Sequence, residues 1–378
     1  MIKINLDGSR INLCTYVDDF AIAASDPALI TELCDILKQR YTVTESDNLE
    51  SFLGIHIVKE DDRLYLSQPG HIARCARQAG IDPSSKPAFI PMNPSFNDSD
   101  QDQSPPADKS KYATLLGMLI FVLRTRPDVA YAVNRLATRA AACTLKDYES
   151  LRQVANYLYT TSHLELVYNT RDPEQRTAIV ELLAYSDAAF LTHQDSKSHS
   201  GIHFTLGKDT GVFHARSQKQ KMVTLSSTEA EVYAAVECTK DVIFFRDLLK
   251  ELGYEQLEPT PLHIDNKSAI ALSQPLTGDH RKVRHFMARL RFLIEQVEAK
   301  KIKLEHLAGT AHPSDVLSKP KPRPGHEQNT ADLMGPQRPG AMERQDHTRA
   351  ALQESAPPPA SLPASRKRRA PSPAHSSV

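Results

Sequence analysis

The chain has 378 residues, enough for about two or three domains, and its 46 lysines and arginines balance its 46 aspartates and glutamates. This balance points to no class of partner, and five scattered cysteines without a C-x-x-C pair exclude a disulfide framework and a structural zinc site. The first residues contain no apolar signal segment, and the longest apolar run, residues 115–123, is shorter than the ~20 residues that cross a bilayer. We therefore expect a protein that is not secreted and has no membrane partner.

The first part of the chain, residues 1–88, reads as α+β. Two apolar, strand-like runs, 10–17 and 20–24, flank the adjacent carboxylates Asp18 and Asp19. A tight hairpin turn would place two acids in this position. A plain turn and a metal site for nucleotide chemistry are both open at this point.

The next segments differ in their predicted structure. A helix is expected after Asp26, a good N-cap that is followed by proline, and a second hairpin is expected over residues 51–68. Residues 83–110 are rich in proline, serine and aspartate and are expected to form an exposed linker. Helices are expected over 111–161, and residues 176–320 return to mixed strands and helices.

The composition changes after Lys319. Residues 321–378 contain ten prolines, nine lysines and arginines and five acids, with few large apolar side chains. Such a segment cannot bury enough surface to offset its ordering entropy, so we expect it to be disordered. Its run "RKRR", which begins at Arg366 and ends at Arg369, is either a nuclear-import or nucleic-acid patch or a solvated basic tail. We expect the protein in the cytoplasm, the nucleus or both.

Residues 176–320 carry acids at the ends of several predicted elements. The predicted order is three strands, a helix, a strand, two helices, a strand and a last helix. Asp187 lies near the end of the first strand, Asp265 ends the fourth, and Asp315 lies on or beside the last helix. Each acid alone has an ordinary explanation as a turn residue, an N-cap or a surface group, but the ordered set is much more specific.

The long helix of this region offers two further acids, Glu229 and Glu231. Helical residues advance about 100° each, so residues spaced alternately four and three apart form one stripe along the helix. After its first residue, one such stripe is almost wholly apolar and should face the sheet. Its members are Glu231, Ala235, Cys238, Val242, Phe245, Leu249 and Leu252. Glu229 lies on the other face and has capping-box spacing from Ser226. We therefore interpret Glu229 as a cap and Glu231 as the functional candidate.

Acids that converge from separate elements suit phosphodiester chemistry. Two Mg²⁺ ions about 4 Å apart can bind the attacking and leaving oxygens during in-line displacement. Mg²⁺ prefers oxygen ligands, typically a few carboxylates with water and substrate phosphate. Three or four converging carboxylates would meet that need.

Five segments resemble the RNase H domain of copia-type LTR retrotransposon Pol polyproteins: "YSDAAF", "LSSTEAEVYAA", "IDNKSAIAL", "HRKVRHFMARLRFLIE" and "HPSDVLSKP". Five others resemble the reverse transcriptase of the same polyproteins: "YVDDF", "FLGIHI", "LYLSQ", "YATLLGMLIFVLRTRPDVAYAV" and "RQVANYLYTTSHLELVY". The likeness runs from Asn12 to Pro320, and the motifs follow one another in the family's order.

The resemblance implies an α/β and α+β multidomain chain. Its expected parts are the C-terminal part of a reverse transcriptase palm (1–88), a linker with a helical thumb or connection (89–175), an RNase H-like domain (176–320) and a Pro-rich basic tail (321–378). The RNase H-like fold is expected to contain a mixed five-stranded sheet with flanking helices.

The resemblance also implies a site and an activity. In the RNase H domain it implies four metal ligands: Asp187, Glu231, Asp265 and Asp315. In the palm it implies that Asp18 and Asp19 descend from polymerase metal ligands. The expected function is Mg²⁺- or Mn²⁺-dependent hydrolysis of RNA in RNA–DNA hybrids, which makes the chain a ribonuclease H.

The polymerase half is expected to be incomplete, because the family has a further catalytic aspartate well upstream of its "YVDD" and only 17 residues precede Asp18. We expect no DNA synthesis by this chain alone. Two alternatives stay open. The chain is either an inactive transposon remnant that folds and binds nucleic acid, or a piece of a larger active polyprotein that associates with other Pol-derived chains.

Basic segments and histidines near the acids are further candidates. Six basic residues could hold phosphates, which give affinity without reading sequence: Arg216, Lys219, Lys221, Arg281, Lys282 and Arg284. A solvated charged face explains them equally well. His306 or His312, on the approach to Asp315, is a candidate for a general acid or proton shuttle.

Overall fold

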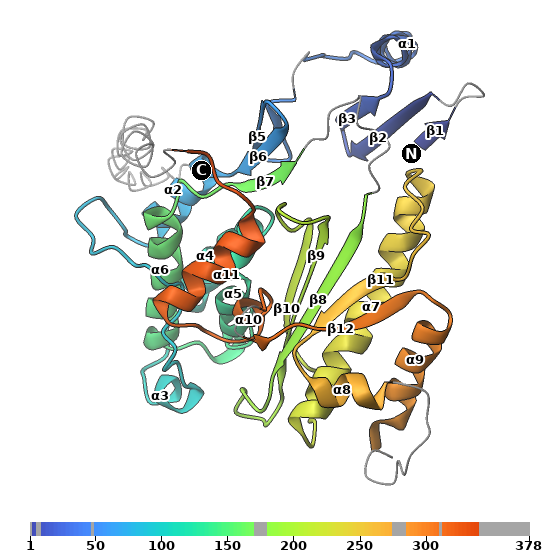
Figure 1. The fold of residues 1–378 in the computed structure, drawn as a ribbon. Helices are drawn as coiled ribbons and strands as arrows, with labels where there is room; N and C mark the ends of the chain where they lie inside the picture. Colours follow the sequence, from blue (N-terminus) through green and yellow to red (C-terminus); the bar gives the residue numbers. More distant parts are fainter. Residues whose placement is uncertain are drawn as a thin grey trace, which may run out of the picture.

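The computed structural model describes residues 2–4, 9–46, 49–169, 180–273, 285–309 and 312–339 (Figure 1). These residues form three sheets with helices around them. Among the described residues, no helix combines the length and the apolarity that crossing a bilayer requires.

The N-terminal unit is a three-stranded antiparallel sheet with one helix. Its elements are β1 (Ile2–Ile4), β2 (Arg10–Tyr16), β3 (Asp19–Ala24) and α1 (Pro27–Lys38). The predicted hairpin and helix are confirmed, and the Asp26 carboxylate caps α1 by accepting from the Ala28 N–H at 2.9 Å. None of the residues of α1 is buried, and the unit lies at the edge of the molecule (Figure 1).

The second sheet joins residues that lie far apart in the sequence. Its strands are β4 (Ser51–Phe52), β5 (Ile55–Glu60), β6 (Arg63–Ser67) and β7 (Leu166–Asn169), in that order. The predicted hairpin over 51–68 is confirmed. Leu66 of β6 pairs with Leu166 of β7, so this sheet spans the expected boundary between residues 88 and 89.

The helical region between β6 and β7 has its own core. Its helices are α2 (Pro69–Gln78), α3 (Asp98–Asp102), α4 (Lys109–Val122), η1 (Pro127–Val129), α5 (Ala130–Ala137), η2 (Ala140–Ala142) and α6 (Leu145–Thr160). Apolar side chains from α4 and α6, including Leu119 and Leu158, are fully buried in it. The expected linker 83–110 is not simply exposed, because it contains α3 and the buried Met92.

The third sheet confirms the predicted mixed five-stranded sheet. Its order is β10 (His214–Lys219), β9 (His199–Leu206), β8 (Leu182–Ala189), β11 (Thr260–Ile264) and β12 (Ile302–His306). The β8–β9 and β9–β10 pairs are antiparallel, whereas β8–β11 and β11–β12 are parallel.

Helices flank this sheet. They are α7 (Ser227–Glu251), α8 (Lys267–Leu272), α9 (Met287–Glu298) and α10 (Asp315–Ser318). The predicted stripe of α7 faces the core, where Ala235, Cys238 and Val242 are buried with apolar residues of the sheet. The helix ends before Gly253, whose φ is +84°. Glycine adopts this left-handed conformation without the steric cost that a Cβ would add.

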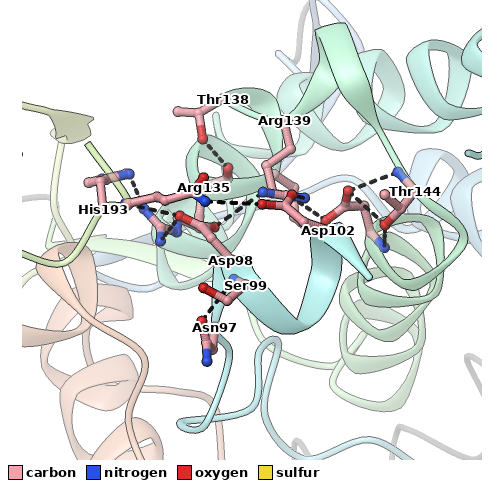
Figure 2. Close-up of polar contacts among 12 residues, drawn as sticks. Asn97, Asp98, Ser99, Asp102, Arg135, Thr138, Arg139, Thr144 and His193 are labelled. Atoms are coloured by element: carbon pink, nitrogen blue, oxygen red, sulfur yellow. Dashed lines mark hydrogen bonds and ion pairs between the residues drawn. The ribbon is translucent and has the colours of Figure 1, made fainter. Parts of the chain in front are cut away.

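A polar network fastens α3 to α5 and to the loop that follows β8 (Figure 2). The Asp98 carboxylate accepts from Arg135 Nη2 at 2.8 Å and from Arg139 Nη1 at 3.4 Å. Arg139 also pairs with Asp102 at 2.7 Å, and Arg135 donates to His193 Nδ1. These contacts join the helical region to the five-stranded sheet through side chains of the expected linker.

The expected disorder after residue 320 is wrong for the segment that forms α11 (Arg323–Met334). Leu333 and Met334 are fully buried in a small core with Leu166 and Leu317. The helix packs against η1, β7 and α10, and Figure 1 shows it lying across the helical region. A few apolar side chains are enough to order this segment, although its overall composition is polar. The basic run from Arg366 to Arg369 lies outside the described residues.

Candidate metal centre

Three of the predicted acids converge at one edge of the five-stranded sheet. Carboxylate oxygens of Asp187, Glu231 and Asp265 lie within 4.8 Å of one another. Asp187 lies near the C-terminal end of β8, and Asp265 directly follows the neighbouring parallel strand β11, so both face the same edge. Glu231 is in the second turn of α7, which packs on this sheet with its apolar stripe.

Asp187 is almost completely buried, and its environment disfavours its charge. Burial raises the pKa of this carboxyl, the nearby Asp315 adds to the shift, and Lys319 opposes it. The Ser318 hydroxyl donates to Asp187 Oδ2, and Lys319 Nζ lies 4.0 Å from the same oxygen. These contacts hold one side of the carboxylate against the segment that contains α10.

Glu231 is buried in the same cluster. Burial raises its pKa well above the usual range, and the charges of Asp187 and Asp265 raise it further. Its Oε1 accepts from the Ala188 N–H at 3.2 Å, while its buried Oε2 accepts no hydrogen bond from the described residues. An unsatisfied buried carboxylate oxygen beside two other carboxylates is costly unless a cation binds there.

The cluster fits a divalent cation with a preference for oxygen. Three carboxylates supply the hard ligands that Mg²⁺ and Mn²⁺ take, and Glu231 Oε2 is a buried acceptor without a donor among the described residues. A bound divalent charge would also reverse the raised pKa values, because it favours the ionised carboxylates.

Asp315, the fourth predicted ligand, is not a member of this three-acid group. Its two oxygens face lysines instead, with Lys319 Nζ 2.7 Å from Oδ1 and Lys321 Nζ 2.5 Å from Oδ2. Burial alone would raise the pKa of Asp315, but the two ammonium groups outweigh it and lower that pKa. The structure thus places Asp315 beside Asp187, with lysines around it.

Sequence reasoning missed the side chains that surround Asp315. Ser318, Lys319 and Lys321 were not among the candidates. The one available signal was the spacing of Asp315 and Lys319, which are four residues apart and therefore neighbours on a helix. This spacing is common on solvated helix faces, so it carries little information alone.

Glu229 takes the capping role that was predicted for it. The Ser226 hydroxyl accepts from the Glu229 N–H at 3.1 Å. The Glu229 carboxylate accepts from the Leu225 N–H at 2.7 Å, one residue before the expected partner. Glu229 also lies 3.1 Å from His285 Nε2, and it is not part of the three-acid group.

The two candidate histidines differ in position. His312 is fully buried, and its Nε2 lies 3.2 Å from the carbonyl oxygen of His263, to which it can donate. Its buried Nδ1 has no hydrogen-bond partner among the described residues. His306 is exposed at the end of β12. His312 also lies close enough to Asp187 for its charge to oppose the rise in the pKa of that carboxyl.

Two of the candidate phosphate contacts are engaged with acids. Arg216 pairs with Asp241 at 2.7 Å, and Lys219 pairs with Asp195 at 2.9 Å. Lys221 is exposed. Three further candidates lie outside the described residues: Arg281, Lys282 and Arg284.

The acids of the N-terminal hairpin are exposed. Asp18 lies in the turn between β2 and β3, and Asp19 is the first residue of β3. Among the described residues, no group of three potential metal ligands forms around them. The hairpin therefore presents the pair to solvent, with no third ligand in the part of the chain that the structure describes.

No protein-family model matches the chain. Among solved structures, LC11-RNase H1 isolated from compost matches with a TM-score of 0.29 and 14% identity, over 37% of this chain and 94% of that one. A prototype foamy virus protease–reverse transcriptase matches with a TM-score of 0.22 and 18% identity, over 78% of this chain and 35% of that one.

Curated relatives give the family. The Retrovirus-related Pol polyprotein from transposon RE1 of Arabidopsis thaliana is 30% identical over 86% of this chain and 22% of its own length. That from transposon TNT 1-94 of Nicotiana tabacum is 29% identical over 84% of this chain and 24% of its own length. The chain spans about a fifth of the length of the first relatives it matches. The chain belongs to the copia-type retrotransposon Pol polyproteins.

Proposed function

We propose that residues 176–320 form a ribonuclease H domain that hydrolyses the RNA strand of RNA–DNA hybrids with two divalent metal ions. One observation carries this proposal: three carboxylates from three separate elements, at Asp187, Glu231 and Asp265, lie within 4.8 Å of one another. The family membership supports it, since the chain shares long stretches with retrotransposon Pol polyproteins.

Each acid has a distinct setting for this role. Bound Mg²⁺ or Mn²⁺ would supply an activated water and stabilise the leaving oxygen. The Ala188 N–H holds Glu231 through Oε1 and leaves Oε2 for a cation, while Ser318 orients Asp187. Asp265 is the least buried member of the three. Asp315 and its lysines lie next to Asp187.

Cleavage of a labelled RNA–DNA hybrid tests the proposal. Wild type should cleave in Mg²⁺ or Mn²⁺, and Asp265→Asn should lose at least about a hundredfold in rate, as expected for a metal ligand. Asp247→Asn, an exposed acid on α7, is the matched control and should cleave like wild type. Equal, background-level signal from wild type and Asp265→Asn would contradict the ribonuclease.

A second candidate is a remnant that binds nucleic acid without cleaving it. The lysine pairs at both oxygens of Asp315 favour it, because they occupy a predicted ligand. Hybrid binding by wild type without cleavage at any Mg²⁺ or Mn²⁺ concentration would support this candidate. A role within a larger polyprotein is compatible with either, since the chain spans about a fifth of its relatives.

For the polymerase part we propose no independent DNA synthesis. The Asp18–Asp19 hairpin is exposed and lacks a third acidic neighbour among the described residues. Primer extension on an RNA template with Mg²⁺ or Mn²⁺ tests this, and robust nucleotide incorporation would overturn it.

A further inference from the structure

Lys319 places a positive charge at the edge of the acid cluster. It directly follows α10, and its ammonium lies 2.7 Å from Asp315 Oδ1 and 4.0 Å from Asp187 Oδ2. It therefore contacts one acid outside the three-acid group and approaches one acid inside it. Asp187 is the residue that both arrangements share.

The two sides of Asp187 differ in the ammonium groups near their carboxylates, although Asp315 Oδ1, like Glu231 Oε2, accepts no well-aligned hydrogen bond from the described residues. On the side of α10, Asp187 Oδ2 accepts a hydrogen bond from the Ser318 hydroxyl. The two Asp315 oxygens face the ammonium groups of Lys319 and Lys321. On the side of α7, Glu231 Oε2 is buried and receives no hydrogen bond from the described residues. Among the described residues, lysines thus pair with both oxygens of Asp315, whereas no lysine or arginine forms an ion pair with Glu231.

We propose that the Lys319 ammonium occupies the place of a second divalent ion between Asp187 and Asp315. This inference rests on the proposed metal-dependent function. The first ion binds at Asp187, Glu231 and Asp265; of these three acids only Asp187 forms an ion pair with Lys319, at the long distance of 4.0 Å. The second ion binds only when Lys319 swings away, because an ammonium and a divalent cation a few ångströms apart repel each other strongly.

Lys319 is suited to leave and return. Its side chain is 40% exposed, whereas those of Asp187 and Asp315 are 1% and 5% exposed, so the lysine can turn into solvent while the acids stay. A lysine carries its charge on a flexible four-carbon stem, which allows this movement without a backbone change. Lys321 differs, because its only acidic contact among the described residues is Asp315 Oδ2.

Counting bound Mn²⁺ on the full chain, by calorimetry and by the electron paramagnetic resonance of free Mn²⁺, tests this assignment. Wild type should bind one ion tightly and a second weakly. Lys319→Met should bind the second ion about tenfold more tightly, a modest gain because the lysine is partly exposed and screened. Lys240→Met removes an exposed helix lysine that pairs with Glu237 and should match wild type.

The outcomes separate this inference from the proposed function. One outcome would overturn the role of Lys319 alone. In it, wild type binds a first ion that Glu231→Gln loses, but the dissociation constant of the second ion is the same in Lys319→Met as in wild type. Absence of any bound ion in both wild type and Lys319→Met would contradict the metal centre itself and the proposed function with it.

A measurement on wild type covers the case in which Lys319→Met does not fold. Acetylation of Lys319 by an acylating reagent, read by mass spectrometry, should be slow without metal because the ammonium is paired. Saturating Mn²⁺ should raise it several-fold, and Lys240 should not change. A Lys319 that stays equally unreactive when two ions are bound would overturn the proposal.

Discussion

The guanidinium of Arg126 and the carboxylate of Asp128 form a two-point ion pair in the interior of the helical region. Arg126 Nε and Nη2 lie 2.9 and 2.8 Å from the two carboxylate oxygens, and each residue is only 1% exposed. The Tyr157 hydroxyl donates to Asp128 at 2.6 Å and in turn lies 3.0 Å from His326 Nε2 of α11. Burial alone would raise the pKa of Asp128, but the charge of Arg126 outweighs it and lowers that pKa.

Asp128→Asn should therefore destabilise the protein strongly. The substitution leaves the Arg126 charge buried and uncompensated, which costs about 3–5 kcal/mol. Urea unfolding followed by circular dichroism at neutral pH gives the change in the free energy of unfolding. Asp62→Asn, in the exposed turn after β5, is the control and should change stability by less than about 0.5 kcal/mol. A loss for Asp128→Asn no larger than that would show that the ion pair is not structurally important.

The network of Figure 2 makes a separate prediction about Asp98. Asp98→Ala should lower stability by about 2 kcal/mol, because Arg135 and Arg139 lose a partly buried acceptor. Asp100→Ala, on the same short helix but exposed, serves as the control. Thermal unfolding of both variants checks this, and equal melting temperatures would contradict an anchored α3.

A pH-dependent contribution is expected from His199. Burial, followed by the charge of Arg135, lowers the pKa of this imidazole to about 3. As pH falls, the imidazole takes up a proton near pH 6.5 in the unfolded chain but not in the folded one. The contribution of neutral His199 to the free energy of unfolding is therefore complete above pH 6.5 and is lost as pH falls toward 3. Between these two pH values the free energy of unfolding falls by about 1.4 kcal/mol per pH unit.

His199→Gln removes this titration. The stability difference between wild type and His199→Gln should shrink by about 2 kcal/mol between pH 7 and pH 5, in urea titrations at each pH. A difference for His199→Gln that does not change with pH would mean that its imidazole titrates in the folded state as it does in the unfolded one.

Leu333→Ala tests the docking of α11. The side chain is fully buried, so truncation should cost about 2–5 kcal/mol in the free energy of unfolding. Glu327→Ala changes an exposed residue of the same helix and should cost less than about 0.5 kcal/mol. If the unfolding curves of wild type and Leu333→Ala coincide, α11 is not docked on the core, and the segment is disordered as its composition predicts.

The features that the sequence predicted well are those that a local period or an ordered motif specifies. The stripe on α7 follows from the 3.6-residue period, and it selected Glu231 for the cluster and Glu229 for the cap. The convergence of Asp187 and Asp265 follows from their places at the ends of neighbouring parallel strands. These relationships need only a correct order of elements.

The features that the sequence did not predict depend on contacts between distant residues. The order of α11 comes from Leu333 and Met334 in a core shared with Leu166, and an average over a long proline-rich tail conceals two such side chains. Likewise, the lysines at Asp315 become visible only when the chain after α10 is placed in space. Composition does not reveal such pairs, and the four-residue spacing of Asp315 and Lys319 is too common on helices to single out that pair.

The pairing of β6 with β7 has a consequence for how the molecule is built. Leu66 and Leu166 are partners in one antiparallel ladder, so the chain enters and leaves the region from α2 to α6 at the same place. In its connectivity, β6 and β7 form an antiparallel hairpin, and the helical region is inserted between the two strands in place of a short turn. Because loop-closure entropy rises by only about 0.6 kcal/mol for each doubling of length, such an exchange of a turn for a module is thermodynamically cheap.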